Sequence, residues 1–260
     1  MKFKSISSDL LVTIVTLIAA FAAVTAAMAS QQPGPGFERY DQAYPEPYAY
    51  PLAQNTARVS VASDGIQTNS DSYEASISAD GRFVAFVSSA SNLVTGDTNG
   101  MKDVFVHDRQ SGETTCVSAV SEGTQANGHS SWPSISADGR YVAFISEASN
   151  LVTGDTNGLK DVFVHDRQSD ETTRISVAGD AFDAAVSISA DGRYVAFEST
   201  ASYLVEGDTN WNGDIFVHDR QTGETSRVSV ASDGTQVSGW SFRPSISAAG
   251  RYVTFESLAD

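Results

Sequence analysis

Short apolar runs separated by turn residues fill most of the chain after residue 57. One stretch shows the pattern. Pro133–Ser136 predicts a short strand, and Asp138-Gly139 predicts a tight hairpin turn. Arg140–Ser146 is apolar at successive positions, which predicts a strand buried on both faces. After a long loop, Asp161–Asp166 and Thr172–Val177 predict a third and a fourth strand. No segment after residue 30 has the periodicity of an amphipathic helix.

This four-strand unit is repeated along the chain. Arg82 to Arg140 is 58 positions, Arg140 to Arg193 is 53, and Arg193 to Arg251 is 58. A period of this length indicates one supersecondary unit copied several times, whose apolar faces are buried only when the copies pack on each other. The motif Ser-Ile-Ser-Ala-Asp-Gly-Arg lies at Ser76–Arg82, Ser134–Arg140 and Ser187–Arg193, with an Ala-for-Asp version at Ser245–Arg251. The motif Phe-Val-His-Asp-Arg lies at Phe105–Arg109, Phe163–Arg167 and Phe216–Arg220.

The combination Ser-x-Asp-Gly-Arg-Tyr-Val-Ala-Phe, Asp-Val-Phe-Val-His-Asp and Thr-x-Arg-Val-Ser resembles the TolB-type propeller repeat over residues 57–260. The resemblance implies an all-β fold, a β-propeller of four-stranded antiparallel blades. It leaves the activity open, because that family includes periplasmic scaffold proteins, propellers attached to serine peptidases and some polysaccharide lyases.

The ends of the repeat region predict how the blades are shared. Arg58–Val61 matches Arg227–Val230 and therefore predicts a fourth strand, while Ser245–Glu256 supplies the first two strands of the last copy. We expect three full blades plus one split between the termini. The ring is either four-bladed or an arc of a larger ring, and an arc would leave sheet edges open to self-association.

The first 56 residues differ from the repeats. Lys2 and Lys4 precede the apolar run Leu10–Ala27, which ends in the small-x-small sequence Ala27-Met28-Ala29. This layout predicts a signal peptide over residues 1–29 and a secreted or periplasmic protein with no transmembrane segment after cleavage. The alternative is a retained anchor, since the run is long enough to span a bilayer. Residues 30–56 are rich in Pro, Tyr and Gly and predict a linker.

The net charge of the chain limits the kinds of partner that it can bind. A formal net charge of −16, from 32 acidic and 16 basic residues, argues against nucleic acid and anionic membrane surfaces. It fits cation binding, a cationic partner or a solvated acidic surface. The only cysteine, Cys116, takes a position that later copies give to Arg174 and Arg227, so we do not expect it to be a nucleophile.

The long loop between the second and third strands carries an Asp-Thr-Asn sequence in three copies. Oxygen side chains at loop positions one, three and seven suit a hard cation, so calcium is a candidate cofactor. The competing interpretation is turn chemistry, in which Asn-Gly makes a turn and Asp bonds nearby amides. The candidate ligands are Asp97, Asn99, Asp103, Asp155, Asn157, Asp161, Asp208, Asn210, Asn212 and Asp214.

Repeated histidines predict structure rather than catalysis. His107, His165 and His218 each precede an Asp, but neighbouring strand residues face opposite sides and cannot form a dyad. No Gly-x-Ser-x-Gly elbow and no zinc-type histidine pair occurs, which argues against a serine hydrolase domain and a zinc site.

Residues that break the repeat are the candidates for ligand binding. They lie in long loops, which we expect on one face of the blades. Exposed aromatic side chains there could stack on sugars or anchor a peptide, or they could pack between blades. These residues are His129, Trp132, Tyr203, Trp211, Trp240, Phe242 and Arg243.

These features favour an exported, non-catalytic scaffold that binds a protein or glycan ligand through its long-loop face, with calcium as a candidate support. The alternatives are a carbohydrate-active enzyme (a polysaccharide lyase or hydrolase) with a site in the central channel, and a fragment of a larger propeller protein.

Overall fold

A computed structural model describes residues 56–120, 124–176 and 185–259. The residues from Val59 onward belong to one compact unit. The predicted signal peptide and nearly all of the predicted linker lie outside the described residues. Within the described ranges, no helix combines the length and the apolar character that a membrane span requires.

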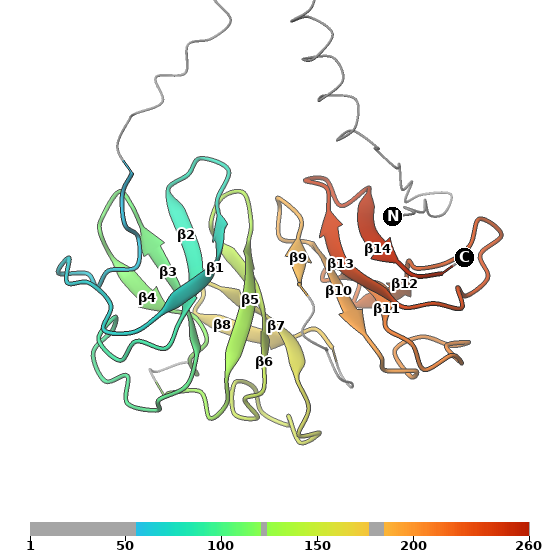
Figure 1. Cartoon of the computed structure of the whole chain (residues 1–260), viewed down its shortest axis with the longest axis horizontal. Helices are drawn as coiled ribbons and strands as arrows, with labels where there is room; N and C mark the ends of the chain where they lie inside the picture. Colours follow the sequence, from blue (N-terminus) through green and yellow to red (C-terminus); the bar gives the residue numbers. More distant parts are fainter. Residues whose placement is uncertain (1–55, 121–123, 177–184, 260) are drawn as a thin grey trace, which may run out of the picture. The chain divides into compact units, whose positions relative to one another are not determined.

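The described residues form antiparallel sheets that follow the sequence order (Figure 1). Three sheets have four strands, in the orders β1-β2-β3-β4, β5-β6-β7-β8 and β9-β10-β11-β12, and a fourth sheet contains β13 and β14. The strands are β1 (Ser72–Ile77), β2 (Phe83–Ser88), β3 (Asp103–Asp108), β4 (Thr114–Cys116), β5 (Ser130–Ile135), β6 (Tyr141–Ser146), β7 (Asp161–Asp166), β8 (Glu171–Arg174), β9 (Ser187–Ile188), β10 (Tyr194–Ser199), β11 (Asp214–Asp219), β12 (Glu224–Arg227), β13 (Ser241–Ile246) and β14 (Val253–Ser257).

Apolar side chains from both faces of the middle strands bury the sheets against one another. On β6, Val142 and Phe144 pack with the first sheet, whereas Ala143 and Ile145 pack with the third. This alternation explains why the second strand of each copy is apolar at successive positions. A third cluster joins Ala196 of β10 to the β13–β14 sheet. Each sheet therefore contacts the next one along the chain.

The first strands of the four sheets are linked in series by their turns. Ala79 N donates to Ala137 O at 3.0 Å, Ala137 N to Ala190 O at 3.0 Å, and Ala190 N to Ala248 O at 2.9 Å. The same hydrogen bond is therefore repeated from each copy to the next. Four sheets joined in this way through equivalent strands confirm the predicted β-propeller architecture.

The two sequence motifs of each copy meet in an ion pair. In the first sheet, Arg82 donates to both carboxylate oxygens of Asp108 at 2.9 and 2.7 Å. Arg140 pairs with Asp166 in the second sheet in the same way. This bidentate pair joins the start of the second strand to the end of the third, and it therefore links two motifs that lie 26 residues apart in the sequence.

Three of the four first strands, β1, β5 and β13, are longer than predicted and contain a bulge. The register of β5 shifts between Ser131 and Ser134, and Trp132 between them has a φ of 55°. Glu74 and Arg243 occupy the equivalent left-handed position, each with a φ of 54°. Because the extra residue interrupts the alternation of apolar and polar positions, the sequence pattern located only the end of each of these three strands.

The predicted fourth strand at Arg58–Val61 is wrong. Val61 makes a single antiparallel bridge with Gln67, and Val230 makes the same bridge with Gln236. In the matching segment, β12 ends at Arg227. The sequence match at the two places therefore repeats the loop that follows a fourth strand rather than the strand itself.

Candidate functional site

The long loops of neighbouring sheets lie on one face and contact each other, as predicted. Asn99 Nδ2 in the loop after β2 donates to Ala126 O in the loop before β5 at 3.2 Å. Asn210 Nδ2 makes the equivalent bond to Val237 O at 2.8 Å. We call this surface the loop face.

The predicted asparagine ligands of the loop face form turns. Asn99 Oδ1 accepts the Met101 amide at 2.9 Å, and Asn157 Oδ1 accepts the Leu159 amide at 3.0 Å. Asn210 Oδ1 accepts the amide of Asn212 at 3.0 Å. Each of these three amide oxygens is therefore engaged in an Asx turn, whereas the turn interpretation had assigned that bond to the aspartate of each loop.

In the second and third sheets, the paired aspartates contact an arginine. Arg174 Nη1 lies 2.9 Å from Asp155 Oδ1 and 3.4 Å from Asp161 Oδ2. Arg227 Nη1 lies 3.4 Å from Asp208 Oδ1 and 3.7 Å from Asp214 Oδ2. All four carboxylate side chains are at most 2% exposed, so the guanidinium supplies the positive charge that buried carboxylates need.

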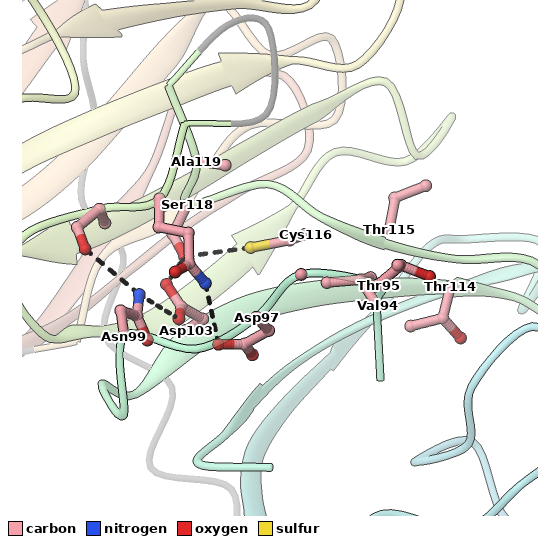
Figure 2. Close-up of a pocket in the computed structure, with 13 residues that line it drawn as sticks. Val94, Thr95, Asp97, Asn99, Asp103, Thr114, Thr115, Cys116, Ser118 and Ala119 are labelled. Atoms are coloured by element: carbon pink, nitrogen blue, oxygen red, sulfur yellow. Dashed lines mark hydrogen bonds between the residues drawn. The ribbon is translucent and has the colours of Figure 1, made fainter. Parts of the chain in front are cut away.

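The first sheet has the same two aspartates beside Cys116 instead of an arginine. Asp103 accepts hydrogen bonds from Ser118 at 2.7 Å and Asn99 at 3.1 Å, and Asp97 accepts one from Gln125 at 3.1 Å. These side chains line a cavity of about 330 Å³. Figure 2 shows Asp97, Asp103 and Cys116 among them. Burial raises the pKa of both Asp97 and Asp103. Among the described residues, no group of three or more His, Cys, Asp or Glu side chains is placed to hold a metal ion.

Two of the predicted aromatic residues lie near each other on the loop face. Trp211 is 75% exposed, and its φ of 60° falls where Gly100 and Gly158 stand in the other loops. The Trp240 ring lies against Gly213, since a Cβ added there would be 2.8 Å from Trp240 Cε3. The loops that carry them are joined by the Asn212 side chain, which donates to Ser238 O at 2.7 Å.

Phe242 and Arg243 extend this region along β13. Phe242 is half-buried and pairs in register with Glu256 of β14. The Arg243 side chain is 72% exposed, and its Nη1 lies 3.4 Å from Glu256 Oε1. A predicted aromatic and a predicted cation therefore continue from Trp240 along one strand.

Glu198 was not among the residues predicted from the sequence. This residue of β10 is 5% exposed and takes the position that Val87 and Ile145 hold in β2 and β6 and that Glu256 holds in β14. Burial raises the pKa of Glu198 to about 7, against the opposing effects of the Arg243 backbone amide and charge. The Gly213 contacts place its Oε1 beside the Trp240 ring. The signal was a carboxylate within an otherwise apolar strand.

The remaining candidates are spread over the blades. Trp132 is half-buried against the cluster between the second and third sheets, and its amide donates to Glu74 Oε2 at 2.7 Å. His129 Nδ1 accepts the Lys102 amide at 2.9 Å. Tyr203 is 61% exposed in the loop after β10. The structure groups Trp211, Trp240, Phe242 and Arg243, and it assigns Trp132 and His129 contacts within the fold.

The three repeated histidines have the same structural contact. His107, His165 and His218 each place Nδ1 within 2.9 to 3.0 Å of a threonine hydroxyl seven residues later. Burial lowers the pKa of all three imidazoles. An identical contact in each of the three four-stranded sheets fits the predicted role in blade packing.

No family model matches the chain, and no curated protein matches it. Solved structures with a similar fold include TolB from Acinetobacter baumannii, at 17% identity and a TM-score of 0.47 over 73% of this chain and 38% of that one. The putative TolB from Agrobacterium tumefaciens matches at 16% identity and a TM-score of 0.44, over 73% of this chain and 60% of that one. The oligogalacturonate lyase from Vibrio parahaemolyticus matches at 15% identity and a TM-score of 0.42, over 72% and 46%. The chain thus spans less than two thirds of each of these proteins.

Proposed function

We propose that this chain is an exported, non-catalytic propeller that binds a protein or glycan ligand through its loop face, around Trp211 and Trp240. The observation that carries the proposal is Trp211. It is 75% exposed and has a φ of 60°, whereas glycine fills the equivalent position of the other two loops.

A bulky residue in the left-handed region is strained, at a cost of about 1–2 kcal/mol relative to the ordinary backbone conformation. The fold does not need the indole to offset this strain, because most of its surface faces solvent. Strained residues are concentrated at functional sites. An exposed tryptophan of this kind supplies a rigid apolar surface on which a sugar ring or an apolar peptide side chain can stack.

The neighbours of Trp211 support a binding surface rather than a single anchor. Trp240 is 38% exposed and covers Gly213, a position held by Lys102 and Lys160 in the other loops. The glycine leaves room for the indole. Arg243 adds an exposed cation beside it, so the region offers two aromatic surfaces and one charged hydrogen-bond donor.

The test is a screen of the chain against an array of polysaccharides and a library of short peptides, repeated with Trp211→Gly. That variant restores the residue of the other loops and leaves the loop geometry intact. Ligands that bind the natural chain should bind the variant at least about tenfold more weakly, as for a central aromatic contact. The matched control is Tyr203→Ala, an exposed aromatic outside the group. Equal binding by Trp211→Gly and the natural chain would refute the proposal.

Export and calcium support are separate parts of the proposal. Export rests on residues 1–29 and is tested by sequencing the N-terminus of the secreted or periplasmic protein, which should begin at Ser30. Calcium support rests on the carboxylates of the loop face and is tested by thermal unfolding with calcium and with a chelator. A melting temperature that is indifferent to both would remove calcium from the proposal.

Glu198 favours a second candidate function, a carbohydrate-active enzyme. A carboxyl whose pKa is raised to about 7 can act as a general acid near neutral pH, and Glu198 lies beside the Trp240 ring. This candidate predicts cleavage of an acidic polysaccharide with a pH dependence that Glu198→Gln abolishes. The absence of turnover on a broad polysaccharide panel would rule it out.

A further inference from the structure

The first sheet contains a cavity at the place where the second and third sheets hold an arginine side chain. Cys116 ends β4, just as Arg174 ends β8 and Arg227 ends β12. The cavity has a volume of about 330 Å³, within the range of small-ligand pockets, which begins near 300 Å³. It is lined by Cys116, Asp97, Asp103 and Gln125 among others, and no described lining residue is basic.

The acceptors that bind the arginine in the other sheets are all present here. Asp97 and Asp103 correspond to Asp155 and Asp161, which lie 2.9 and 3.4 Å from Arg174 Nη1. Gln125 corresponds to Gln236: each amide donates to the first aspartate of its pair, at 3.1 and 2.7 Å. The third sheet shows that this glutamine and an arginine fit together in one site.

We propose that this cavity, the Cys116 pocket, binds the guanidinium group of a ligand in the place that the arginine side chain occupies in the neighbouring sheets. The planar guanidinium donates in several directions at once, so it can bridge two carboxylates. Such a ligand is an arginine side chain of a polypeptide or a small guanidinium compound.

The geometry favours guanidinium over calcium in this pocket. Calcium takes six to eight oxygen ligands. Here Asn99 Oδ1 accepts the Met101 amide, and Asn99 Nδ2 points to Asp103 at 3.1 Å, so the amide presents a donor rather than an oxygen to that carboxylate. Among the described residues, the two aspartates are the only acidic side chains that line the cavity. The site goes beyond the proposed function, because it lies on another blade from Trp211.

The experiment titrates the full chain with three probes by calorimetry. N-acetyl-arginine methylamide carries the guanidinium, the citrulline analogue is its neutral isostere, and the lysine analogue carries a compact ammonium. We expect the arginine probe to bind at least about tenfold more tightly than either analogue, because only it combines a positive charge with a planar set of donors that point in several directions. A comparison of agmatine with an arginine-containing tripeptide then distinguishes the two kinds of ligand. Equal affinity of the two probes indicates a small guanidinium compound, and weaker binding of agmatine indicates a polypeptide.

Two variants locate the binding. Cys116→Arg places the side chain of the other sheets in the pocket, so it should abolish probe binding. Cys116→Ser, its matched control, should retain binding. Asp155→Asn, in the sheet where Arg174 already fills the site, should also leave binding unchanged. If Asp155→Asn fails to fold, the two Cys116 variants still decide the question.

The chain's only cysteine provides a second readout. Because Cys116 lines the pocket, a saturating arginine probe should slow its alkylation severalfold, while the citrulline analogue should not. The proposal is overturned by the absence of binding, by equal binding of the citrulline analogue, or by binding that survives in Cys116→Arg. Calcium binding that competes at Asp97 in place of the probe would also overturn it.

Discussion

Removal of the Arg174 side chain should create in the second sheet a cavity like the one beside Cys116 in the first sheet. It should also destabilise the protein. The side chains of Asp155 and Asp161 are 2% and 0% exposed, and Arg174 is 17% exposed. Loss of one partner from a buried ion pair costs about 3–5 kcal/mol, because the other charge stays buried without compensation. For a folded unit of about 200 residues this corresponds to a fall in melting temperature of roughly 6–20 °C.

The third sheet supplies an internal control for this reasoning. Arg227 is farther from its aspartates, at 3.4 and 3.7 Å, and Gln236 also donates to both of them, at 2.7 and 3.2 Å. The sequence has no glutamine in the loop between β8 and β9. Arg227→Cys should therefore cost less than Arg174→Cys, about 1–2 kcal/mol, since the loss of one hydrogen-bond partner is of that size. Cys116→Arg should raise the free energy of unfolding.

The assay is urea unfolding followed by circular dichroism, at pH 7 and pH 5. The pKa of Asp161 is already raised by burial, and removal of the guanidinium raises it further. A carboxyl with a raised pKa contributes stability that is present at low pH and is lost as the pH rises through the folded-state pKa. The deficit of Arg174→Cys should therefore be smaller at pH 5. A deficit below about 1 kcal/mol at pH 7, or a larger deficit for Arg227→Cys, would refute the argument.

Three further predictions concern other side chains. Trp211→Gly should be more stable than Trp211→Ala by about 1 kcal/mol in urea unfolding, because glycine alone relieves the positive φ. Burial raises the pKa of Glu198 from 4.5 to about 7, so the natural protein loses stability as the pH rises through 7. This loss should amount to up to about 3 kcal/mol between pH 5 and pH 8, and Glu198→Gln should not show it. Arg193 lowers the pKa of Asp219 to about 2, so this pair contributes stability above pH 4 that is lost as the pH falls toward 2. An acid titration of Arg193→Gln should lack that step.

The parts of the fold that the sequence predicted are those fixed by burial on both faces. Tyr141–Ser146 and Asp161–Asp166 are apolar in runs because sheets cover them from both sides, and each appears as a strand where it was expected. The bulge at Trp132 was not predictable, because its left-handed φ is imposed by pairing and by the bond to Glu74. The match of Arg58–Val61 to Arg227–Val230 led to a wrong strand prediction for a related reason. The matching segment is the loop that follows β12, and the local sequence does not distinguish such a loop from the end of a strand.

The candidate site was predicted in location rather than in contacts. Asp97 and Asp103 were predicted as candidate calcium ligands, and Cys116 was identified as a replacement for arginine, yet the sequence did not connect them. The sequence does not show this contact, because the residues meet only after folding. The end of the fourth strand then lies against the loop that precedes the third strand. Once Arg174 is seen between Asp155 and Asp161, the three residues of the first sheet become one site.

Residues that depart from the repeat differ in their effect on stability, and this effect distinguishes neutral substitutions from those with a functional role. Ala249 replaces a turn aspartate on the hairpin side and removes only local hydrogen bonds of the kind that Asp191 accepts from the Ser189 hydroxyl and the Arg193 amide. Cys116, Glu198 and Trp211 each act against stability, by leaving two carboxylates without their arginine, by burying a carboxyl and by straining the backbone. All three lie at the loop ends of strands or in the loops, where side chains can reach a ligand. Destabilising residues persist where binding offsets their cost, so the loop face is the part of this propeller to probe for ligands.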